Sequence, residues 1–296
     1  MAPPPLLVVN PTAGGGRARR LWPIIRDTLT HGRFVFDVVE TREPGHAVAL
    51  ATEAARARVP LVVAVGGDGT LNEVVNGVAP LRDEWPITVG AVMTGRGRDA
   101  CRNLGLIRDP VRAARRLIDG RPVSFDLGLA DWPGGRRFFV GCVGAGFDAV
   151  VTERAGRRGG RLTYLKAVVT SLRDYHTTDL TVQPAGAPAW NGPAASVVVC
   201  NGSRFGGGML IAPAARPDDG LLDVILLGGL GRAELACWLP TVYWGGHVAN
   251  SKIKTWRATQ VRVTSAAPLR AQLDGELCAH TPLDVSIHAA ALRLLV

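Results

Sequence analysis

The fold of this 296-residue chain is decided by one stretch of sequence, Val62-Val63-Ala64-Val65-Gly66-Gly67-Asp68-Gly69-Thr70-Leu71-Asn72-Glu73. Its first four residues are apolar and predict a fully buried strand. A glycine-rich turn follows, and then the start of a helix. Glycines let main-chain N–H groups approach an anion closely, and a helix N-terminus adds partial positive charge. The stretch therefore predicts a phosphate-binding turn between a strand and a helix.

The carboxylate of Asp68 inside this turn would repel a phosphate by itself. It therefore indicates either a bridging Mg²⁺ or a role in organising the turn. The turn is not a Walker A loop, because none of the three lysines of the chain follows a glycine. Gly144-Ala145-Gly146 with Ala149 matches a dinucleotide fingerprint, but we find no βαβ unit after it and expect no dinucleotide there.

The first 120 residues alternate apolar strands with helical patterns, which predicts a parallel sheet covered on both faces. Ligands bind such sheets at the carboxyl ends of the strands, where the glycine and asparagine signals of this chain lie. We expect strands at 6–9, 34–40, 61–65 and 87–92, and helices at 19–29, 46–58, 71–78, 99–104 and 111–119.

From about Arg121 onward, short strands are separated by Gly, Pro, Asn and Asp turns, which is typical of an antiparallel sandwich. We expect strands at 123–130, 137–143, 180–182, 196–200, 222–227, 260–264, 269–273 and 283–288, helices at 162–175 and 233–245, and flexible loops at 131–137 and 183–193. The predicted fold is α/β plus β. A Rossmann-like nucleotide-binding domain covers 1–122, with 289–296 returning to it, and a β-sandwich substrate domain covers 123–288.

The composition is that of a globular protein with an excess of arginine. Hydrophobic residues make up 47% and charged residues 20%, the net charge is +9, and only three of the 34 basic residues are lysines. Arginine pairs bidentately with oxyanions, so the excess suits phosphate ligands, anionic lipid headgroups or nucleic acid, or is simply a solvated surface. The five scattered cysteines lack C-x-x-C spacing and predict reduced thiols in the cytosol rather than disulfides or a zinc site.

Several stretches resemble, in order, the catalytic domain of the diacylglycerol and sphingosine kinases. They are Val8-Val9-Asn10-Pro11-Thr12-Ala13-Gly14-Gly15-Gly16; Thr41 with Pro44-Gly45-His46-Ala47; Gly66–Thr70; Asn201-Gly202; Gly206-Gly207-Gly208-Met209 with Ala212-Pro213; Asp218–Asp223; and Leu273-Asp274-Gly275-Glu276. The resemblance spans the whole chain and is similar in length and order to the bacterial soluble lipid kinases. NAD kinases share the Gly66–Thr70 turn.

The resemblance implies a lipid kinase that uses ATP and Mg²⁺ and transfers the γ-phosphate to a lipid hydroxyl such as that of diacylglycerol. It implies that Asp274 is the general base on the hydroxyl, with Glu276 close by. It also implies a structural Mg²⁺ site at Asp219 with backbone oxygens of Arg216 and Leu221. The implied nucleotide-binding residues are Asn10, Thr41, Gly66, Gly67, Asp68, Gly69, Thr70 and Asn72.

The chemistry of phosphoryl transfer agrees with these roles, since it needs positioning, charge neutralisation and one carboxylate to accept the hydroxyl proton. Asp274 and Glu276 lie two residues apart around a glycine. On an extended strand end both could face one cleft, whereas a tight hairpin turn would splay them. Pro217-Asp218-Asp219-Gly220 is likewise a good turn on its own terms.

One loop departs from the family pattern, which reads Gly-Thr-Gly-Asn-Asp. Here the loop is Gly95-Arg96-Gly97-Arg98-Asp99, so that Arg96 and Arg98 replace a threonine and an asparagine expected at the nucleotide. Thr94 comes before Gly95 rather than after it, which is too early for the threonine's role unless the loop shifts. Either the arginines bind ATP phosphates or an acidic substrate, or they obstruct the site and leave a weak or inactive nucleotide-binding protein.

Three classes of function therefore stay open. A lipid kinase leads, because the net charge fits docking on an anionic membrane, where each nearby basic residue contributes about 1 kcal/mol. We expect a cytoplasmic protein peripheral to the membrane, with the basic stretch 154–161 as a docking patch or a solvated loop, and we allow for a homodimer. The alternatives are a kinase of a non-lipid hydroxyl such as that of NAD, or a nucleotide-binding regulator. We expect no nucleic-acid partner, because no recognition helix or aromatic RNA motif accompanies the charge.

We expect neither a signal peptide nor a membrane span. The N-terminus has no basic region followed by a long apolar stretch, and no apolar run approaches the roughly 20 residues that a membrane helix needs.

Overall fold

The computed structural model describes residues 3–97, 99–156 and 161–296. The chain divides into two compact units: the first comprises Met1–Phe125 and Ala290–Val296, and the second comprises Asp126–Ala289. The observed division falls three residues after the expected boundary at 122, and the returning segment begins one residue later than expected. Two strands contain these boundaries, β5 (Pro122–Trp132) and β15 (Leu283–Leu295).

The first unit is a parallel sheet flanked by helices. Its elements are β1 (Leu6–Val9), α1 (Ala13–His31), β2 (Asp37–Glu40), α2 (His46–Arg56), β3 (Leu61–Gly66), α3 (Asp68–Val78), a 3₁₀ turn (Ala79–Leu81), β4 (Thr88–Met93), α4 (Asp99–Asn103) and α5 (Pro110–Asp119). The strands pair in parallel in the order β2-β1-β3-β4, and Arg293 and Leu294 of β15 add a parallel strand beside β4. The predicted Rossmann-like architecture is confirmed.

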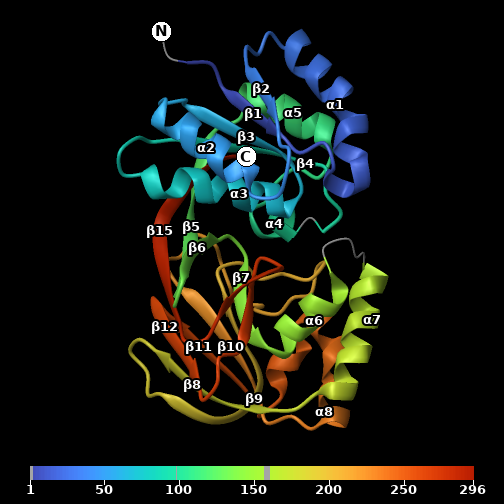
Figure 1. Cartoon of the computed structure of the whole chain (residues 1–296), viewed down its shortest axis with the longest axis vertical. Helices are drawn as coiled ribbons and strands as arrows, with labels where there is room; N and C mark the ends of the chain where they lie inside the picture. The colour runs from blue at the N-terminus through green and yellow to red at the C-terminus, as the bar shows by residue number, and fades with distance from the viewer. Residues whose placement is uncertain (1–2, 98, 157–160) are drawn as a thin grey trace. The chain divides into compact units, whose positions relative to one another are not determined.

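Both faces of this sheet are buried, which explains why its strands are continuously apolar. Leu7, Val63 and Val92 pack in one cluster with residues of α1 and α5. The neighbouring residues Val8 and Val62 are equally buried and point to the opposite face, because side chains alternate along a strand. The helices α2 and α3 pack on each other and on β1 and β3 (Figure 1).

The second unit is an antiparallel sandwich, as predicted. Its elements after β5 are β6 (Gly135–Phe139), β7 (Cys142–Gly146), α6 (Phe147–Ala155), α7 (Arg161–Ser171), a 3₁₀ turn (Leu172–Asp174), β8 (Thr178–Pro184), β9 (Trp190–Cys200), β10 (Leu222–Gly228), α8 (Arg232–Trp238), 3₁₀ segments (Leu239–Trp244 and Gly246–Ala249), β11 (Ile253–Ala258), β12 (Gln260–Ser265), β13 (Arg270–Leu273), β14 (Glu276–His280) and the first part of β15.

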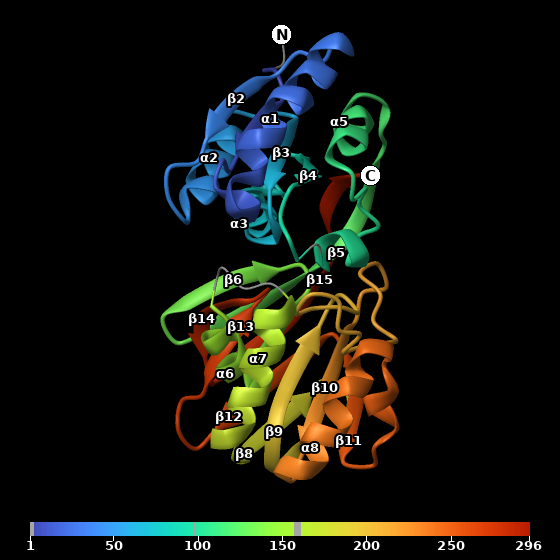
Figure 2. The ribbon, with the colours of Figure 1, turned by 90° about the vertical axis from the view of Figure 1, so that its right-hand side faces the viewer.

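Strand β9 makes the corner of the sandwich. Its first half, from Trp190 to Ala194, pairs with β8, and its second half, from Ser196 to Cys200, pairs with β7 and β10. Val197 and Val199 face the sandwich interior, whereas Val198 packs in a second cluster that includes residues of α6, α7 and α8. These helices lie against the strands in Figure 2.

Several local predictions for the second unit were wrong. The single strand expected at 137–143 is two strands, because the chain bends at Val140 and Gly141 between β6 and β7. The loop expected at 131–137 is largely the β5–β6 hairpin, and most of the loop expected at 183–193 belongs to β8 and β9. Helix α6 and the strands β11 and β14 were not anticipated, and β15 extends seven residues beyond its expected end at 288.

Two further expectations concern membranes and thiols. Among the helices of the described ranges, none combines the length and the apolar composition that a membrane crossing requires. None of the five cysteines forms a disulfide.

The close packing of α2 against α3 generates a prediction. A Cβ atom at Gly77 would lie 2.6 Å from both the Cβ of Ala51 and the carbonyl oxygen of Val48. Alanine favours a helix by about 1 kcal/mol over glycine, yet overpacking costs about 1–3 kcal/mol. Gly77→Ala should therefore lower the thermal midpoint of unfolding, measured by circular dichroism.

The control for this prediction is Gly229→Ala, because a Cβ atom there would make only ordinary contacts, at 3.5 Å or more, with Pro193. Equal midpoints for the wild type and Gly77→Ala would show that α2 and α3 are not held at the described separation.

Candidate active site

Three loops of the first unit meet at one edge of the parallel sheet. They follow β1, β3 and β4, whose carboxyl ends lie at the same edge because the strands are parallel. The Nδ2 of Asn10, after β1, donates to the Oγ1 of Thr70 at 3.0 Å. The N–H of Thr94, after β4, donates to the carbonyl oxygen of Gly66 at 2.7 Å. These bonds join the three loops into one surface.

The loop after β3 has the strand–turn–helix geometry that the sequence predicts. Helix α3 begins at Asp68, directly after Gly67, which is extended at φ −98° and ψ −174°. The first N–H groups of a helix have no partner within it and carry partial positive charge. A Cβ atom at Gly66 would lie 2.4 Å from the Oγ1 of Thr70, so only glycine fits without displacing the side chain bound by Asn10.

The loop after β4 lies against this turn through main-chain contact. A Cβ atom at Gly95 would lie 2.7 Å from the Cα of Gly67. The side chain of Thr94 is fully buried, and its Oγ1 donates to the carbonyl oxygen of Gly66 at 3.2 Å. Thr94 therefore holds the loop in place and does not substitute for the threonine that the resemblance expects at position 96.

The carboxylate of Asp68 fastens the same two loops. Its Oδ1 accepts the N–H of Ala100, in the first turn of α4, at 3.2 Å. A Cβ atom at Gly97 would lie 2.7 Å from its Oδ2. Of the two roles considered for Asp68, these contacts favour the organisation of the loop.

The loop after β1 continues into the first residues of α1, where three consecutive glycines lie in the left-handed region and are not helical. Gly14, Gly15 and Gly16 have φ values of 65°, 70° and 81°, a conformation that other residues adopt only with strain. The Nη2 of Arg96 lies 2.9 Å from the position of a Cβ atom at Gly15. The exposed Arg96 guanidinium therefore stands beside the glycine loop, where it adds positive charge to the edge.

Three other predicted nucleotide residues have different outcomes. Thr41 lies at the carboxyl end of β2, where its N–H donates to the carbonyl oxygen of Val9 at 2.8 Å. Asn72 is buried in α3, and Asn76 Nδ2 donates to its side-chain oxygen at 3.1 Å. Arg98 lies outside the described residues.

The second unit carries Asp274 in a two-residue hairpin turn between β13 and β14. Asp274 and Gly275 have φ values of 47° and 86°, as the tight hairpin turns require. The Asp274 carboxylate accepts three consecutive main-chain N–H groups of the β6–β7 bend: Val140 at 2.8 Å, Gly141 at 2.8 Å and Cys142 at 3.0 Å. These three donors fix its orientation.

The two predicted carboxylates bind different partners. Glu276 forms an ion pair with Arg137 at 2.8 Å, whereas Asp274 binds the bend at Val140. The buried Asn201 supports that bend, since its Nδ2 donates to the carbonyl oxygens of Val140 at 3.1 Å and Asp126 at 3.0 Å. Asn201 of the Asn201-Gly202 motif thus fixes the bend at Val140, and the bend in turn binds the carboxylate of Asp274.

The residues implied for a structural metal make other contacts. The Oδ1 of Asp219 accepts the N–H of Leu221 at 3.1 Å, and its Oδ2 pairs with Arg257. The Nε of Arg257 also lies 3.6 Å from the buried Oδ2 of Asp223. Burial raises the pKa of Asp223, and the charge of Arg257 opposes this shift. The Asp219 corner thus holds a cation of the chain's own, and the Mg²⁺ site implied at Asp219 with the backbone oxygens of Arg216 and Leu221 stays a prediction. Within the described ranges, no cluster of three or more His, Cys, Asp or Glu side chains could hold a metal ion.

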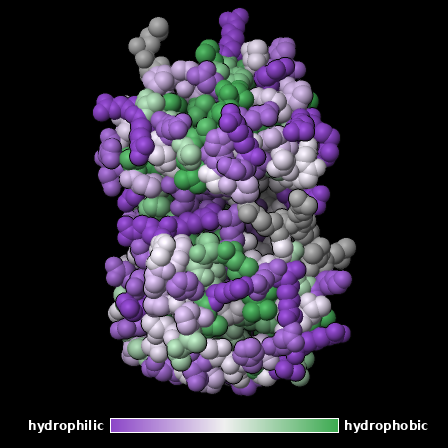
Figure 3. All heavy atoms as spheres, viewed as in Figure 1, coloured by the Kyte–Doolittle hydropathy of each residue, from purple (hydrophilic) through white to green (hydrophobic). Residues whose placement is uncertain are grey.

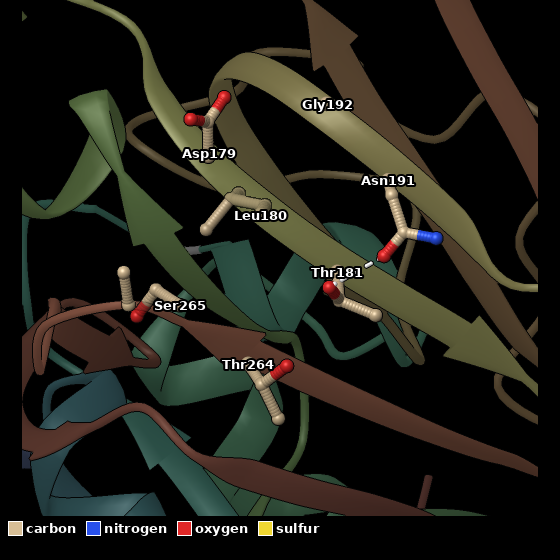
Figure 4. A pocket seen from close by; sticks show the side chains of 8 residues that line it. Asp179, Leu180, Thr181, Asn191, Gly192, Thr264 and Ser265 are labelled. Carbon is tan, nitrogen blue, oxygen red and sulfur yellow. Dashed lines mark hydrogen bonds between the residues drawn. The ribbon is translucent and has the colours of Figure 1, made fainter.

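A depression of about 480 Å³ lies elsewhere on the second unit, over β8, β9 and β12. Figure 4 shows its small polar side chains, among them Thr181, whose Oγ1 donates to the Oδ1 of Asn191 at 2.6 Å. Asp179 supplies a carboxylate to the rim, which disfavours a phosphate ligand. None of the predicted site residues lines it.

Comparison with known proteins accounts for both units. The model of the diacylglycerol kinase catalytic domain matches residues 4–130, and the model of the YegS C-terminal NAD kinase β-sandwich-like domain matches residues 141–296. The chain belongs to this family of lipid kinases. It is 29% identical to a diacylglycerol kinase of Mycobacterium tuberculosis, over 97% of this chain and 93% of that protein. It is 31% identical to a YegS-like lipid kinase of Pseudomonas aeruginosa, over 86% of this chain and 82% of the relative.

Solved structures agree on the fold of this lipid kinase family member. A diacylglycerol kinase from Bacillus anthracis superposes with a TM-score of 0.81 at 24% identity, covering 99% of this chain and 96% of that chain. Yeast NADH kinase, in complex with NADH, superposes with a TM-score of 0.54 at 10% identity, covering 100% of this chain and 84% of that chain.

Sequence reasoning missed the partners of the predicted residues. Arg137, Arg257 and the main chain at Val140 gave no signal, because each acts on a carboxylate more than 30 residues away in sequence. The turn residues Asp274 and Gly275 did carry a signal, since Asp-Gly is typical of tight hairpins.

The corner around Arg257 generates a prediction about metal. In Arg257→Ala, Asp219 and the buried Asp223 lose their cation, which should lower the free energy of unfolding by about 1–3 kcal/mol. Mg²⁺ should restore part of this loss in the variant, whereas the thermal midpoint of the wild type should be equal in Mg²⁺ and in EDTA. Differential scanning fluorimetry measures both.

Arg262→Ala is the matched control, because Arg262 forms a cross-strand pair with Asp284 in which both side chains are about half exposed. Its removal should cost less than about 1 kcal/mol and confer no Mg²⁺ dependence. A wild-type midpoint that rises in Mg²⁺ as much as that of Arg257→Ala would contradict the assignment.

Proposed function

We propose that this protein transfers the γ-phosphate of ATP, used as its Mg²⁺ complex, to the hydroxyl group of a lipid such as diacylglycerol. The observation that carries the proposal is the glycine-lined edge of the first unit, formed by the loops of Asn10, Gly66–Thr70 and Gly95. Family membership supports the reaction class, and a carboxylate held by three main-chain donors in the second unit supports the proton transfer.

The first unit is assigned the triphosphate. Main-chain N–H groups at the start of α3 and at Gly14 and Gly15 can approach phosphate oxygens, because no side chain intervenes. We propose that Arg96 adds a charge-assisted contact to a phosphate, since its guanidinium stands beside Gly15. Mg²⁺ would bind the triphosphate oxygens and neutralise part of their charge.

The second unit is assigned the acceptor. We propose that Asp274 takes the proton of the lipid hydroxyl while the hydroxyl oxygen forms a bond to the γ-phosphorus. The bond from that phosphorus to the β–γ bridging oxygen breaks, and ADP leaves. The three donors from Val140 to Cys142 keep the carboxylate oriented throughout.

An apolar surface on the second unit supports a lipid acceptor. On the face drawn in Figure 3, apolar residues gather over the region that Figure 1 labels β7 and α6. Val150 of α6 and Leu277 of β14 are 39% and 38% exposed, and α6 packs on β14. Leu277 follows Asp274 by three residues, so acyl chains resting on this surface would bring their hydroxyl close to the hairpin.

We further propose that the protein works at the cytoplasmic surface of an anionic membrane. The net charge of +9 favours such a surface, and a diacylglycerol substrate resides there. The part of the basic stretch at 157–160 lies outside the described residues.

A second candidate is phosphorylation of a soluble dinucleotide. The fold likeness to yeast NADH kinase favours it, although the whole-chain matches to lipid kinases favour the first candidate. A third, a nucleotide-binding regulator without turnover, rests on the arginines at positions 96 and 98.

The role of Asp274 generates a prediction. Asp274→Asn keeps the size of the side chain but removes the proton acceptor, so turnover should fall by about 10²–10⁴-fold. The Kd for ATP of Asp274→Asn, measured by isothermal titration calorimetry, should differ from that of the wild type by less than about twofold. Turnover is measured as label passing from γ-labelled ATP to diacylglycerol in mixed micelles.

Asp284→Asn is the control, because Asp284 lies in the same unit and pairs at the surface with Arg262; its activity should equal that of the wild type. Asp68→Ala, which loses the bond to Ala100, should instead weaken ATP binding. Full turnover in Asp274→Asn would remove Asp274 from the reaction.

The position of Arg96 generates a further prediction. If its guanidinium binds a phosphate, Arg96→Thr loses a charge-assisted hydrogen bond and the Kd for ATP should rise about 10-fold. Raising the salt concentration should reduce the difference in Kd for ATP between Arg96→Thr and the wild type, because salt screens the charge interaction. Arg20→Thr, on the exposed part of α1, is the control and should not change the Kd. Tighter ATP binding or faster turnover in Arg96→Thr would favour obstruction.

A further inference from the structure

The Gly144-Ala145-Gly146 stretch has no part in the nucleotide-binding edge. It ends β7, and α6 follows directly, but β7 pairs antiparallel with β9 and β13, so no βαβ unit forms. A Cβ atom at Gly144 would lie 1.8 Å from the Oδ2 of Asp148. The glycine therefore makes room for the carboxylate of Asp148 beneath the strand, a role that requires no bound ligand.

Asp148 is buried, with 7% of its surface exposed. Its Oδ1 lies 2.6 Å from the Oγ of Ser196, and its Oδ2 accepts the Nε2 of Gln272 at 3.2 Å. Burial raises the pKa of Asp148, and these two hydrogen bonds oppose the shift. The thiol of Cys142 lies 3.7 Å from the Nε2 of Gln272, and Cys142 in turn contacts Cys200.

Gln272 connects this carboxylate to the hairpin turn. Its side chain is fully buried in β13, and its Oε1 accepts the N–H of Gly275 at 2.7 Å. The Oδ2 of Asp148 accepts the NH₂ group of Gln272, which leaves the amide oxygen of Gln272 for the N–H of Gly275. The chain of contacts from Ser196 through Asp148 and Gln272 thus ends on the residue next to Asp274.

We propose that Asp148 and Gln272 are positioning residues for Asp274, holding the left-handed turn that presents its carboxylate. The proposal rests on the proposed function of Asp274 as the proton acceptor. The carboxylate is bound from one side by the bend at Val140–Cys142, and the Gln272–Gly275 bond fixes the turn from the other. A non-glycine residue at φ 47° is stabilised there by its contacts, which here include the Gln272–Gly275 bond and the bond from the N–H of Asp274 to the carbonyl oxygen of Cys142 at 2.9 Å.

The test uses the full chain and three variants. Gln272→Met keeps the side-chain volume and removes both hydrogen bonds. Asp148→Leu keeps the approximate side-chain volume and removes the acceptor of the Gln272 NH₂ group. The double variant Asp148→Asn/Gln272→Glu reverses donor and acceptor, since the new amide at position 148 can donate to one oxygen of the new carboxylate at position 272. The other oxygen of that carboxylate then accepts the N–H of Gly275. Gln183→Met, at an exposed position of β8, is the control.

We expect each single variant to lower kcat for diacylglycerol phosphorylation by about 10-fold to 100-fold, as small displacements of a reacting group do. The KM for ATP should not change, and the double variant should recover most of the loss. Hydrogen–deuterium exchange of peptides covering 270–280 should be faster in the single variants and close to wild type in the double variant.

Wild-type kcat in Gln272→Met, or a double variant no better than the single ones, would overturn the proposal. If the wild type phosphorylates no acceptor, the proposed function fails, and exchange alone then decides whether the network holds the turn. Unchanged exchange at the hairpin in Gln272→Met would overturn the positioning role even then.

Discussion

The candidate site depends on main-chain segments that approach more closely than a Cβ atom permits. Gly66 lies against Thr70, and Gly95 lies against Gly67. A Cβ atom at Gly14 would lie 2.6 Å from the carbonyl oxygen of Thr94. These contacts join three loops that belong to different strands. The result is an edge lined by main-chain amide groups at the start of a helix, which is suited to a polyanion. In the second unit, Gly144 makes room for a side chain rather than for main chain: the missing Cβ atom leaves space for the buried carboxylate of Asp148.

The sequence was sufficient for the architecture and for the loops of the first unit. Continuous apolar strands such as Leu61–Gly66 arise only where both sheet faces are covered, and the glycine turn after it is local in sequence. The second unit was harder because its decisive contacts are long-range. The sequence predicts a continuous strand across Val140. The bend there depends on N–H groups that bind Asp274, 134 residues away, and such a contact leaves no local signal. The function of Gly144 is legible only once Asp148 is seen beneath it.

Arginine supplies cations at two places where the family pattern implies other groups. Arg96 replaces a threonine and stands beside Gly15, and Arg257 pairs with Asp219 where a metal is implied. A guanidinium is always charged and spreads its donors in a plane, so it can bind two oxyanions at once. The fold of the chain places each guanidinium, so its positive charge is present at any concentration of metal ion. These two sites are places where the arginine-rich composition has a structural use.

We propose that the glycine-lined edge and the Asp274 carboxylate together serve phosphoryl transfer to a lipid. The most direct measurement offers γ-labelled ATP with Mg²⁺ to the wild-type protein in the presence of a lipid extract, NAD or neither, and then separates products by organic extraction. A lipid kinase should place label in the organic phase only when lipid is present. Label in a phosphorylated dinucleotide, or ATP binding with no transfer to any acceptor, would contradict the proposal.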